Sequence, residues 1–233
     1  MQPKTYLITG AAKGLGRELS IQLYDAGHQL ILLDKELKAL NALYDELKDS
    51  EERVALYPID LLGANINDYQ NMQSILSEAY PQGLDAVVLN AAILPAFTPI
   101  EHFDYSQWYE VLHTNLNANF HLIQQTLPLL KTAKQGKLCA VTDLDSKKTP
   151  AYYGAYGVAK AGLAQLMESV AAENSTSKLN CYLAELPAFA SDTRGRLYPG
   201  ENPYELTSAA NAAKSIYNAL LQDECDQWIK RLN

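Results

Sequence analysis

Apolar runs that are typical of buried strands alternate with amphipathic segments of helical period along this chain. Uniformly apolar runs fit strands that are covered on both faces, and the segments between them carry apolar residues at helical spacing. We expect strands over residues 4–9, 29–33, 53–59, 84–89, 137–142 and 179–186. We expect helices over residues 15–26, 36–48, 67–79, 105–131, 154–174 and 204–221. Because this alternation requires parallel strands joined by right-handed crossovers, the sequence predicts an α/β fold with a doubly wound parallel sheet and helices on both faces.

Charge and composition limit the partners that the chain can have. Its 233 residues carry a formal net charge of -8, and 48% of them are hydrophobic. Because no basic cluster exceeds the pair Lys147-Lys148, the chain lacks the basic face that binds nucleic acid. The longest apolar stretch, residues 86–97, is interrupted by Asn90 and Pro95 and is too short to span a bilayer. We expect no nucleic-acid partner and no membrane insertion.

Cysteine and histidine usage indicates neither disulfides nor a metal site. The three cysteines are an odd number and lie far apart, which favours buried thiols. The four histidines do not combine with them at metal-ligand spacings, so we predict no metal. With a first strand that begins almost at Met1, leaving no room for a signal peptide, this pattern predicts a reducing cytoplasmic location. The residues concerned are Cys139, Cys181, Cys225, His28, His102, His113 and His121.

A glycine-rich turn follows the first predicted strand and opens the first predicted helix. The segment from Thr9 to Gly16 has the sequence TGAAKGLG. Such a turn lets the backbone approach a pyrophosphate, and the helix N-terminus offers free N–H groups and a positive dipole. The strict G-x-G-x-x-G pattern is absent because Leu19 holds its last position, and no P-loop motif occurs. The turn predicts a bound dinucleotide rather than an ordinary strand-to-helix connection, and therefore a Rossmann-type sheet with strand order 3-2-1-4-5-6.

The whole chain is predicted to form one domain. Neither repeats nor low-complexity tracts nor linkers interrupt residues 1–233. Residues 227–232 form either a short seventh edge strand or nothing regular. Ligands of such sheets bind beyond the carboxyl ends of the strands, so we expect the chemistry just after them.

Asp34, at the end of the second predicted strand, indicates which dinucleotide is preferred. It lies twenty residues after Gly14, where a carboxylate accepts both ribose hydroxyls of an adenosine. The same carboxylate repels a 2′-phosphate, which favours NAD. Lys13 and Lys35 are placed where a cation meets that phosphate, so NADP remains an alternative.

Tyr156 and Lys160 follow the fifth predicted strand at a spacing that suits acid–base chemistry. The separation of four residues puts the phenol and the ammonium on one helix face. A nearby cation favours the phenolate, and we therefore expect the pKa of Tyr156 to be lowered toward the range of a catalyst. A surface Tyr/Lys pair is the alternative, since the chain contains fifteen tyrosines.

These features together resemble the short-chain dehydrogenase/reductase family, over nearly the whole chain to about residue 195. Thr9 to Gly16 matches the T-G-x-x-x-G-x-G turn of that family, and Tyr156 to Lys160 matches its Y-x-x-x-K motif. The other similar segments are Asp60-Leu61, which resembles the adenine-contacting pair, Asn90-Ala91-Ala92, similar to N-A-G, Asn115, at the active-site asparagine, and Pro187-Ala188, in place of Pro-Gly.

The resemblance implies hydride transfer between a nicotinamide and a small carbonyl or alcohol substrate. Tyr156 is expected to exchange a proton with the substrate oxygen, Lys160 to lower the tyrosine pKa and bind the nicotinamide ribose, and Asn115 to hold a proton-relay water. A homodimer is expected through the small-residue helix over residues 154–174 and the long helix before it. The cofactor contacts implied are Gly10, Lys13, Gly14, Leu15, Gly16, Asp34, Asp60, Leu61, Asn90, Ala91, Ala92, Tyr156, Lys160 and Pro187.

The chain departs from the family pattern at Asp143, thirteen residues before Tyr156, where the family has a serine that hydrogen-bonds the substrate oxygen. An ionised carboxylate has no proton to donate and repels developing negative charge. Losing one such donor costs on the order of 3–4 kcal/mol in a transition state. A one-residue bulge that turns Thr142 inward, or Ser146 folding back, would restore a hydroxyl.

Two functions therefore stay open. The leading hypothesis is an NAD-preferring oxidoreductase in which Tyr156, Lys160, Asn115 and Asp143 are the catalytic residues. The alternative is a cofactor-binding protein with lost or altered catalysis and a role in sensing or interaction. Asp143 is the feature that separates them.

Overall fold

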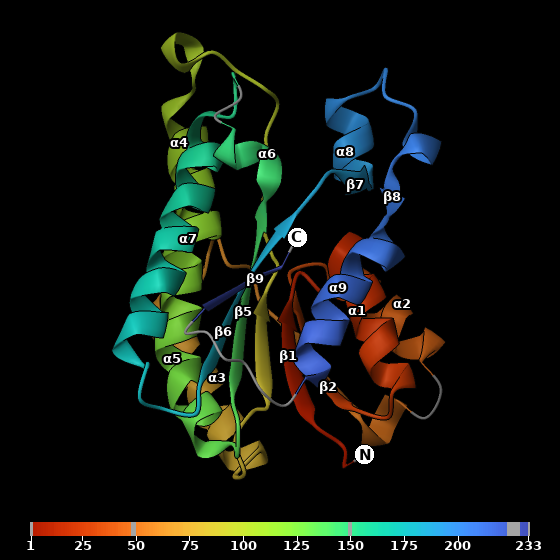
Figure 1. Ribbon diagram of the computed structural model, residues 1–233, viewed down its shortest axis with the longest axis vertical. Helices are drawn as coiled ribbons and strands as arrows, with labels where there is room; N and C mark the ends of the chain where they lie inside the picture. The colour runs from red at the N-terminus through yellow and green to blue at the C-terminus, as the bar shows by residue number, and fades with distance from the viewer. Residues whose placement is uncertain (1, 48–49, 149–150, 223–228, 233) are drawn as a thin grey trace.

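In the residues that the computed structural model describes, 2–47, 50–148, 151–222 and 229–232, seven parallel strands form one sheet (Figure 1). The strand order is β3-β2-β1-β4-β5-β6-β9, which confirms the predicted Rossmann-type sheet. Of the two possibilities for the last residues, the structure has the short seventh edge strand, β9. The strands are β1 Thr5–Thr9, β2 Gln29–Asp34, β3 Val54–Pro58, β4 Ala86–Leu89, β5 Lys137–Asp143, β6 Asn180–Leu186 and β9 Ile229–Leu232. A separate pair of short parallel strands comprises β7 Phe189–Ala190 and β8 Thr207–Ser208.

Helices cover both faces of the sheet, as the uniformly apolar strands require. In β1, Tyr6 and Ile8 face one hydrophobic core, which α1, α2 and α9 cover, whereas Leu7 faces a second core beneath α3, α5 and α7. The helices are α1 Gly14–Asp25, α2 Leu37–Glu46, α3 Ile66–Ala79, α4 Tyr105–Leu112, α5 Ala118–Thr132, α6 Leu144–Lys147, α7 Gly154–Glu173, α8 Asp192–Leu197 and α9 Ala209–Leu221.

The helices differ from the prediction in three places. The predicted helix over residues 105–131 is interrupted by a π-helical segment, His113–Asn117, between α4 and α5. The last helix begins at Ala209 instead of residue 204, because the Ser208 hydroxyl caps it by accepting from the Asn211 N–H at 3.2 Å. The stretch expected to be a loop before it contains the short helix α8.

Strand β5 runs one residue further than predicted and ends in Asp143, which pairs with Leu186 of β6. The next residue begins α6. The register of β5 with β6 is continuous from Lys137 to Asp143, so the bulge that would turn Thr142 inward does not form. The side chain of Ser146, Cys225 and the predicted element ends at Lys48 and Gln227 lie outside the described residues. Asp143 is thus held at the carboxyl edge of the sheet by regular strand pairing.

Candidate active site

A cavity of about 650 Å³ lies at the carboxyl ends of the strands. Its lining includes predicted site residues at the ends of six strands, β1 to β6, so the fold brings together residues that the sequence spreads from Gly10 to Pro187. The predicted residues that line it are Gly10, Lys13, Gly14, Leu15, Asp34, Asp60, Leu61, Asn90, Ala91, Ala92, Asp143, Tyr156, Lys160 and Pro187. Gly16 and Asn115 are not among its lining residues.

The glycine turn leaves room beside the first turn of α1. Gly14 has φ +52°, and a Cβ built on it would meet no atom within 4 Å, so its backbone faces open space in the cavity. No described side chain caps this helix, and its first turn carries no acidic residue. Gly16 is required by the packing of the turn itself, because a Cβ there would lie 2.1 Å from the Gly10 carbonyl oxygen. The glycine turn and the first turn of α1 therefore suit an anionic group that accepts hydrogen bonds from backbone N–H groups.

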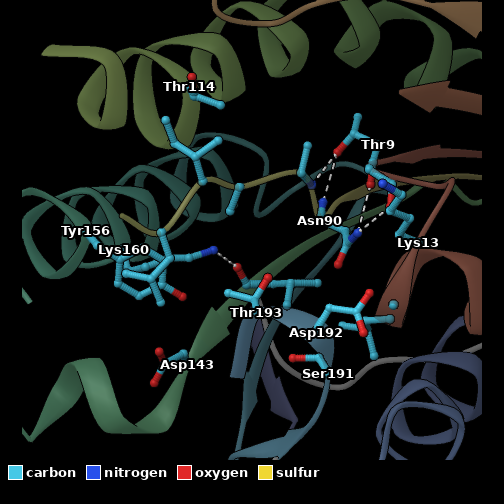
Figure 2. A pocket seen from close by; sticks show the side chains of 18 of the residues that line it. Thr9, Lys13, Asn90, Thr114, Asp143, Tyr156, Lys160, Ser191, Asp192 and Thr193 are labelled. Atoms are coloured by element: carbon cyan, nitrogen blue, oxygen red, sulfur yellow. Dashed lines mark hydrogen bonds between the residues drawn. The ribbon is translucent and has the colours of Figure 1, made fainter. Parts of the chain in front are cut away.

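Asn90 joins the end of β4 to the glycine turn. Its Nδ2 donates to the carbonyl oxygens of Thr9 and Gly10, both at 3.0 Å, and its own N–H donates to the Thr9 hydroxyl at 2.9 Å (Figure 2). These bonds fix the floor of the cavity between the first and fourth strands.

The Asp34 carboxylate is oriented by two backbone donors. It accepts from the Ala12 N–H and from the Glu36 N–H, each at 3.1 Å. Beside it, Lys13 Nζ lies 2.5 Å from a Glu36 carboxylate oxygen. The pairing raises the pKa of Lys13 and lowers the pKa of Glu36. The cation that would favour a 2′-phosphate is thus engaged by a carboxylate.

Asp60 and Leu61 form the turn after β3 and line the same end of the cavity as Asp34. The Asp60 carbonyl accepts from the Gly63 and Ala64 N–H groups at 3.1 and 2.9 Å. Leu61 is buried. An apolar side chain beside a carboxylate suits an adenine ring and its ribose.

Tyr156 and Lys160 lie on the face of α7 that packs toward β5 (Figure 2). Both are buried, and the Lys160 ammonium donates to the Val141 carbonyl at 2.8 Å. Burial lowers the pKa of Lys160 to about 8, while the charge of Asp143 acts in the opposite direction. Lys160 is therefore anchored to the strand that carries Asp143.

The pKa of the Tyr156 phenol is raised well above its usual value. Burial is the main cause, and the charge of Asp143 adds to it. The prediction that Lys160 would lower this pKa was wrong, because the ammonium points at the Val141 carbonyl and lies 5.6 Å from the centre of the tyrosine ring. Burial and the charge of Asp143 therefore favour the protonated phenol.

Asn115 is buried in the π-helical segment and holds the backbone beyond β4. Its side chain both accepts from the Ile93 N–H and donates to the Ile93 carbonyl, each at 2.8 Å. Its own carbonyl oxygen accepts from Asn119 Nδ2 at 2.8 Å. These contacts give Asn115 a positioning function, while its function in a proton relay stays a prediction.

Two tyrosines that also line the cavity, Tyr153 and Tyr198, were not predicted from the sequence. Their hydroxyls lie 3.3 Å apart, and Phe97 contacts both rings, with centroid distances of 5.3 and 5.1 Å. Tyr198 follows α8, whose start was signalled by the Ser191-Asp192 pair, a typical N-cap followed by an acidic first turn. The Ser191 hydroxyl indeed accepts from the Arg194 N–H at 3.1 Å.

Charged side chains of α6 and α8 also line this end. Arg194 makes two bonds to Glu201, with Nε at 2.6 Å and Nη2 at 2.7 Å from the carboxylate oxygens. Its Nη1 lies 3.7 Å from Asp145 of α6. Among the described residues, no group of three or more His, Cys, Asp or Glu side chains is arranged to hold a metal ion. Within the same residues, the helices are too short or too polar to cross a membrane.

Comparison with known proteins identifies the family. A family model described as short chain dehydrogenase matches residues 4–202. An uncharacterized oxidoreductase of Escherichia coli K12, YciK, is 27% identical over 226 residues, which cover 96% of this chain and 88% of that protein. A short chain dehydrogenase of Escherichia coli CFT073, solved in complex with NADPH, superposes with a TM-score of 0.89 at 25% identity, covering 99% of this chain and 97% of that one.

A Shigella flexneri short chain dehydrogenase complexed with NADP has the same fold, with a TM-score of 0.90, 24% identity, and coverage of 99% and 97% of the two chains. The matched residues include the glycine turn and the Tyr156–Lys160 helix. The chain therefore belongs to the short chain dehydrogenase family of oxidoreductases.

Proposed function

We propose that this protein is an NAD(P)-dependent oxidoreductase that interconverts a small alcohol and its carbonyl compound. The observation that carries the proposal is the single cavity that joins the open glycine turn to Tyr156, Lys160 and Asp143. The relative solved with NADPH supports a nicotinamide dinucleotide as the cofactor.

The residues of the cavity fit such a cofactor along its length. The backbone at Gly14 and Leu15 offers N–H groups to a pyrophosphate, Asp34 offers carboxylate oxygens to an adenosine ribose, and Leu61 offers an apolar wall to the adenine. Lys160 and Pro187 line the end of the cavity where the nicotinamide half would be held. When bound, the nicotinamide gives or takes the hydride.

The protein's own contribution is to place and move a proton at the reacting oxygen. In reduction, Tyr156 donates its proton to the carbonyl oxygen; in oxidation, it takes the proton of the alcohol. Below a pH of about 8, Lys160 carries a positive charge at the end of the cavity where the nicotinamide half would be held. The charge of Asp143 favours the protonated phenol and so opposes release of that proton.

We propose a preference for NAD over NADP. Two backbone N–H groups hold the Asp34 carboxylate in place, so its charge would face a 2′-phosphate directly. Lys13 is paired with Glu36 at 2.5 Å, and its charge is largely offset. Lys35 is then the cation left to favour NADP.

The alternative of a cofactor-binding protein without catalysis has less support. The buried Tyr156 and Lys160 keep the arrangement that proton transfer requires, and burying both groups is costly for a fold that does not use them. Asp143 alters the chemistry of this pair without removing it from the cavity.

We also propose a homodimer, a single domain and a cytoplasmic location. Exposed apolar side chains gather on α4 and α7, which pack side by side: Tyr105, Tyr109 and Val158 are 82%, 67% and 51% exposed. Such a surface suits an isologous contact with a second copy. Gly162 is better explained by packing within the chain, since a Cβ there would lie 2.9 Å from Leu116. Cys139 and Cys181 are buried thiols, which suits a reducing compartment.

The test is oxidation of a panel of small secondary alcohols with NAD as the acceptor, followed by the absorbance of NADH. We expect turnover with at least one alcohol class, lost by about a hundredfold or more in Tyr156→Phe. NADH titration serves as the control, since Tyr156→Phe should still bind the cofactor. Turnover that is unchanged in Tyr156→Phe would contradict the proposal.

A further inference from the structure

We infer that Tyr153 is a second catalytic tyrosine of this site, whose hydroxyl donates a hydrogen bond to the reacting oxygen of the substrate where the family pattern has a serine. The inference rests on the proposed function and adds a residue outside the motifs that the chain shares with its family. It follows from the contacts that Tyr153 makes with Tyr156 and Tyr198.

Strand β5 brings no hydroxyl to the place where the family pattern has its serine. Asp143 occupies that position at the end of the strand, and a charged carboxylate cannot donate. The neighbouring hydroxyl of Thr142 is directed at the Ala184 carbonyl of β6, at 3.4 Å. A second donor to the reacting oxygen therefore has to come from another element of the cavity.

Tyr153 lies at the start of the helix that carries Tyr156. Its carbonyl accepts from the N–H groups of Tyr156 and Gly157 at 3.0 and 3.2 Å, which fixes its backbone against the first turn of α7. Its ring contacts the Tyr156 ring edge-on, with centroids 5.7 Å apart and an interplanar angle of 71°. Both side chains are buried and both line the cavity. The two phenols thus enter the cavity side by side.

Both phenols respond to the same carboxylate. Burial is the main cause that raises the pKa of Tyr153 and of Tyr156, and the charge of Asp143 raises both further. The pKa of Tyr156 is also raised by Tyr153 itself. The two hydroxyls therefore lie near each other and near the position of the family serine. Because the pKa of Tyr153 is raised, its phenol stays protonated and remains a donor at neutral pH.

The hydroxyls of Tyr153 and Tyr198 together retain one hydrogen for the substrate. Their oxygens lie 3.3 Å apart, and one of the two hydrogens is between them. The Tyr198 ring is held by the Arg194 guanidinium, 3.7 Å from the ring centre, and Arg194 is bound twice by Glu201. When Tyr198 donates to Tyr153, the hydrogen of Tyr153 is left for the substrate oxygen, since a hydroxyl hydrogen rotates to suit its partners.

The two tyrosines then have different functions in one step. In reduction, Tyr156 transfers its proton to the carbonyl oxygen. Tyr153 keeps its own proton, and its hydrogen bond stabilises the negative charge that develops on that oxygen. In oxidation, the same hydrogen bond stabilises the oxygen as the alcohol loses its proton to Tyr156.

The test compares kcat/KM for the reduction of 2-butanone, cyclohexanone and acetophenone with NADH at pH 7, between the wild type and Tyr153→Phe. The variant keeps the ring and removes the hydroxyl, so NADH affinity should be unchanged. We expect kcat/KM to fall at least about tenfold for each ketone that the wild type reduces. Tyr204→Phe, the same change at a side chain that is 95% exposed, should keep wild-type activity. A loss of less than about threefold in Tyr153→Phe would overturn the inference alone, whereas a wild type that reduces none of the three ketones would overturn the proposed function with it.

A double-mutant comparison tests whether Tyr153 replaces the serine. In the Asp143→Ser background a hydroxyl is restored at the end of β5, so Tyr153→Phe should lower kcat/KM by no more than about threefold. A purely structural role of Tyr153 would give the same loss in both backgrounds. Equal losses in the two backgrounds, with equal melting temperatures, would overturn the inference.

Two further variants distinguish Tyr153 from the other hydroxyls that line the cavity. Tyr198→Phe removes the residue that positions Tyr153, and Thr193→Val removes a hydroxyl of α8. We expect each to lower kcat/KM less than Tyr153→Phe does. A larger loss in either variant would assign the donor to the α8 side of the cavity and overturn the inference.

Discussion

The carboxylate of Asp143, at the end of β5, and the phenol of Tyr156, in the first turn of α7, line the same cavity close enough for the carboxylate charge to act on the phenol. The carboxylate raises the pKa of Tyr156, which burial has already raised, and it opposes the lowering of the Lys160 pKa. It therefore stabilises the protonated forms of both groups. The proton that the reaction must move is held more tightly than it would be beside a serine.

Cofactor choice is expected to depend on Asp34. NADH should bind more tightly than NADPH, because the carboxylate is aimed by two backbone N–H groups and Lys13 is paired with Glu36. Asp34→Ala should reduce the ratio of the NADPH and NADH dissociation constants by about tenfold. Fluorescence titration of both cofactors measures this, with Asp25→Asn as the control of equal charge change. Tighter binding of NADPH by the wild type would show that Lys35 outweighs Asp34.

The glycine turn offers a second test. Gly16→Ala would place a Cβ 2.1 Å from the Gly10 carbonyl, so the turn must shift. We expect the free energy of unfolding to fall by about 1–3 kcal/mol. The affinity for NADH should fall with it. Gly195→Ala is the matched control, since a Cβ there meets nothing within 4 Å. Normal NADH binding by Gly16→Ala would contradict the account of the turn.

The sequence predicted the sheet and most cavity residues because both depend on local patterns. The apolar run of β5 and the glycine turn can each be recognised from a few consecutive residues. The sequence did not predict that β5 extends to Asp143. A charged residue after an apolar run is typical of a position just beyond the end of a strand. Pairing with Leu186 of β6, 43 residues away, extends it.

The electrostatics of the site depended on contacts that spacing alone does not reveal. The spacing of Tyr156 and Lys160 correctly placed both side chains in one cavity, but it gave the wrong direction for the tyrosine pKa. The reason is the hydrogen bond of Lys160 to Val141, a strand carbonyl that the helix spacing does not identify. Tyr153 and Tyr198 were missed because they meet across 45 residues.

Asn115 is expected to act mainly by holding Ile93. Asn115→Ala leaves the N–H and carbonyl of Ile93 without their side-chain partner, and should cost about 1–3 kcal/mol of unfolding stability. Chemical denaturation measures this, with the exposed neighbour Asn117→Ala as the control. Unchanged stability with lost turnover would instead indicate a direct role in proton transfer.

Assembly is expected to use the surface of α4 and α7. Light scattering should show a dimer at micromolar concentration, and Val158→Glu should shift it toward monomer, because a charge would be buried in the contact. Ile75→Glu, at another exposed apolar position on α3, should leave the dimer intact. A monomeric wild type would exclude this interface.

The effect of Asp143 on proton transfer is tested most directly by comparing carbonyl reduction between the wild type and Asp143→Ser. The measurement is kcat/KM with NADH at pH 7, for two proteins of equal melting temperature. We predict that the variant is at least about tenfold more active, since a neutral hydroxyl that can donate replaces a charge that opposes the oxyanion. A variant that loses a robust wild-type activity, or that matches the wild type, would contradict this account of Asp143.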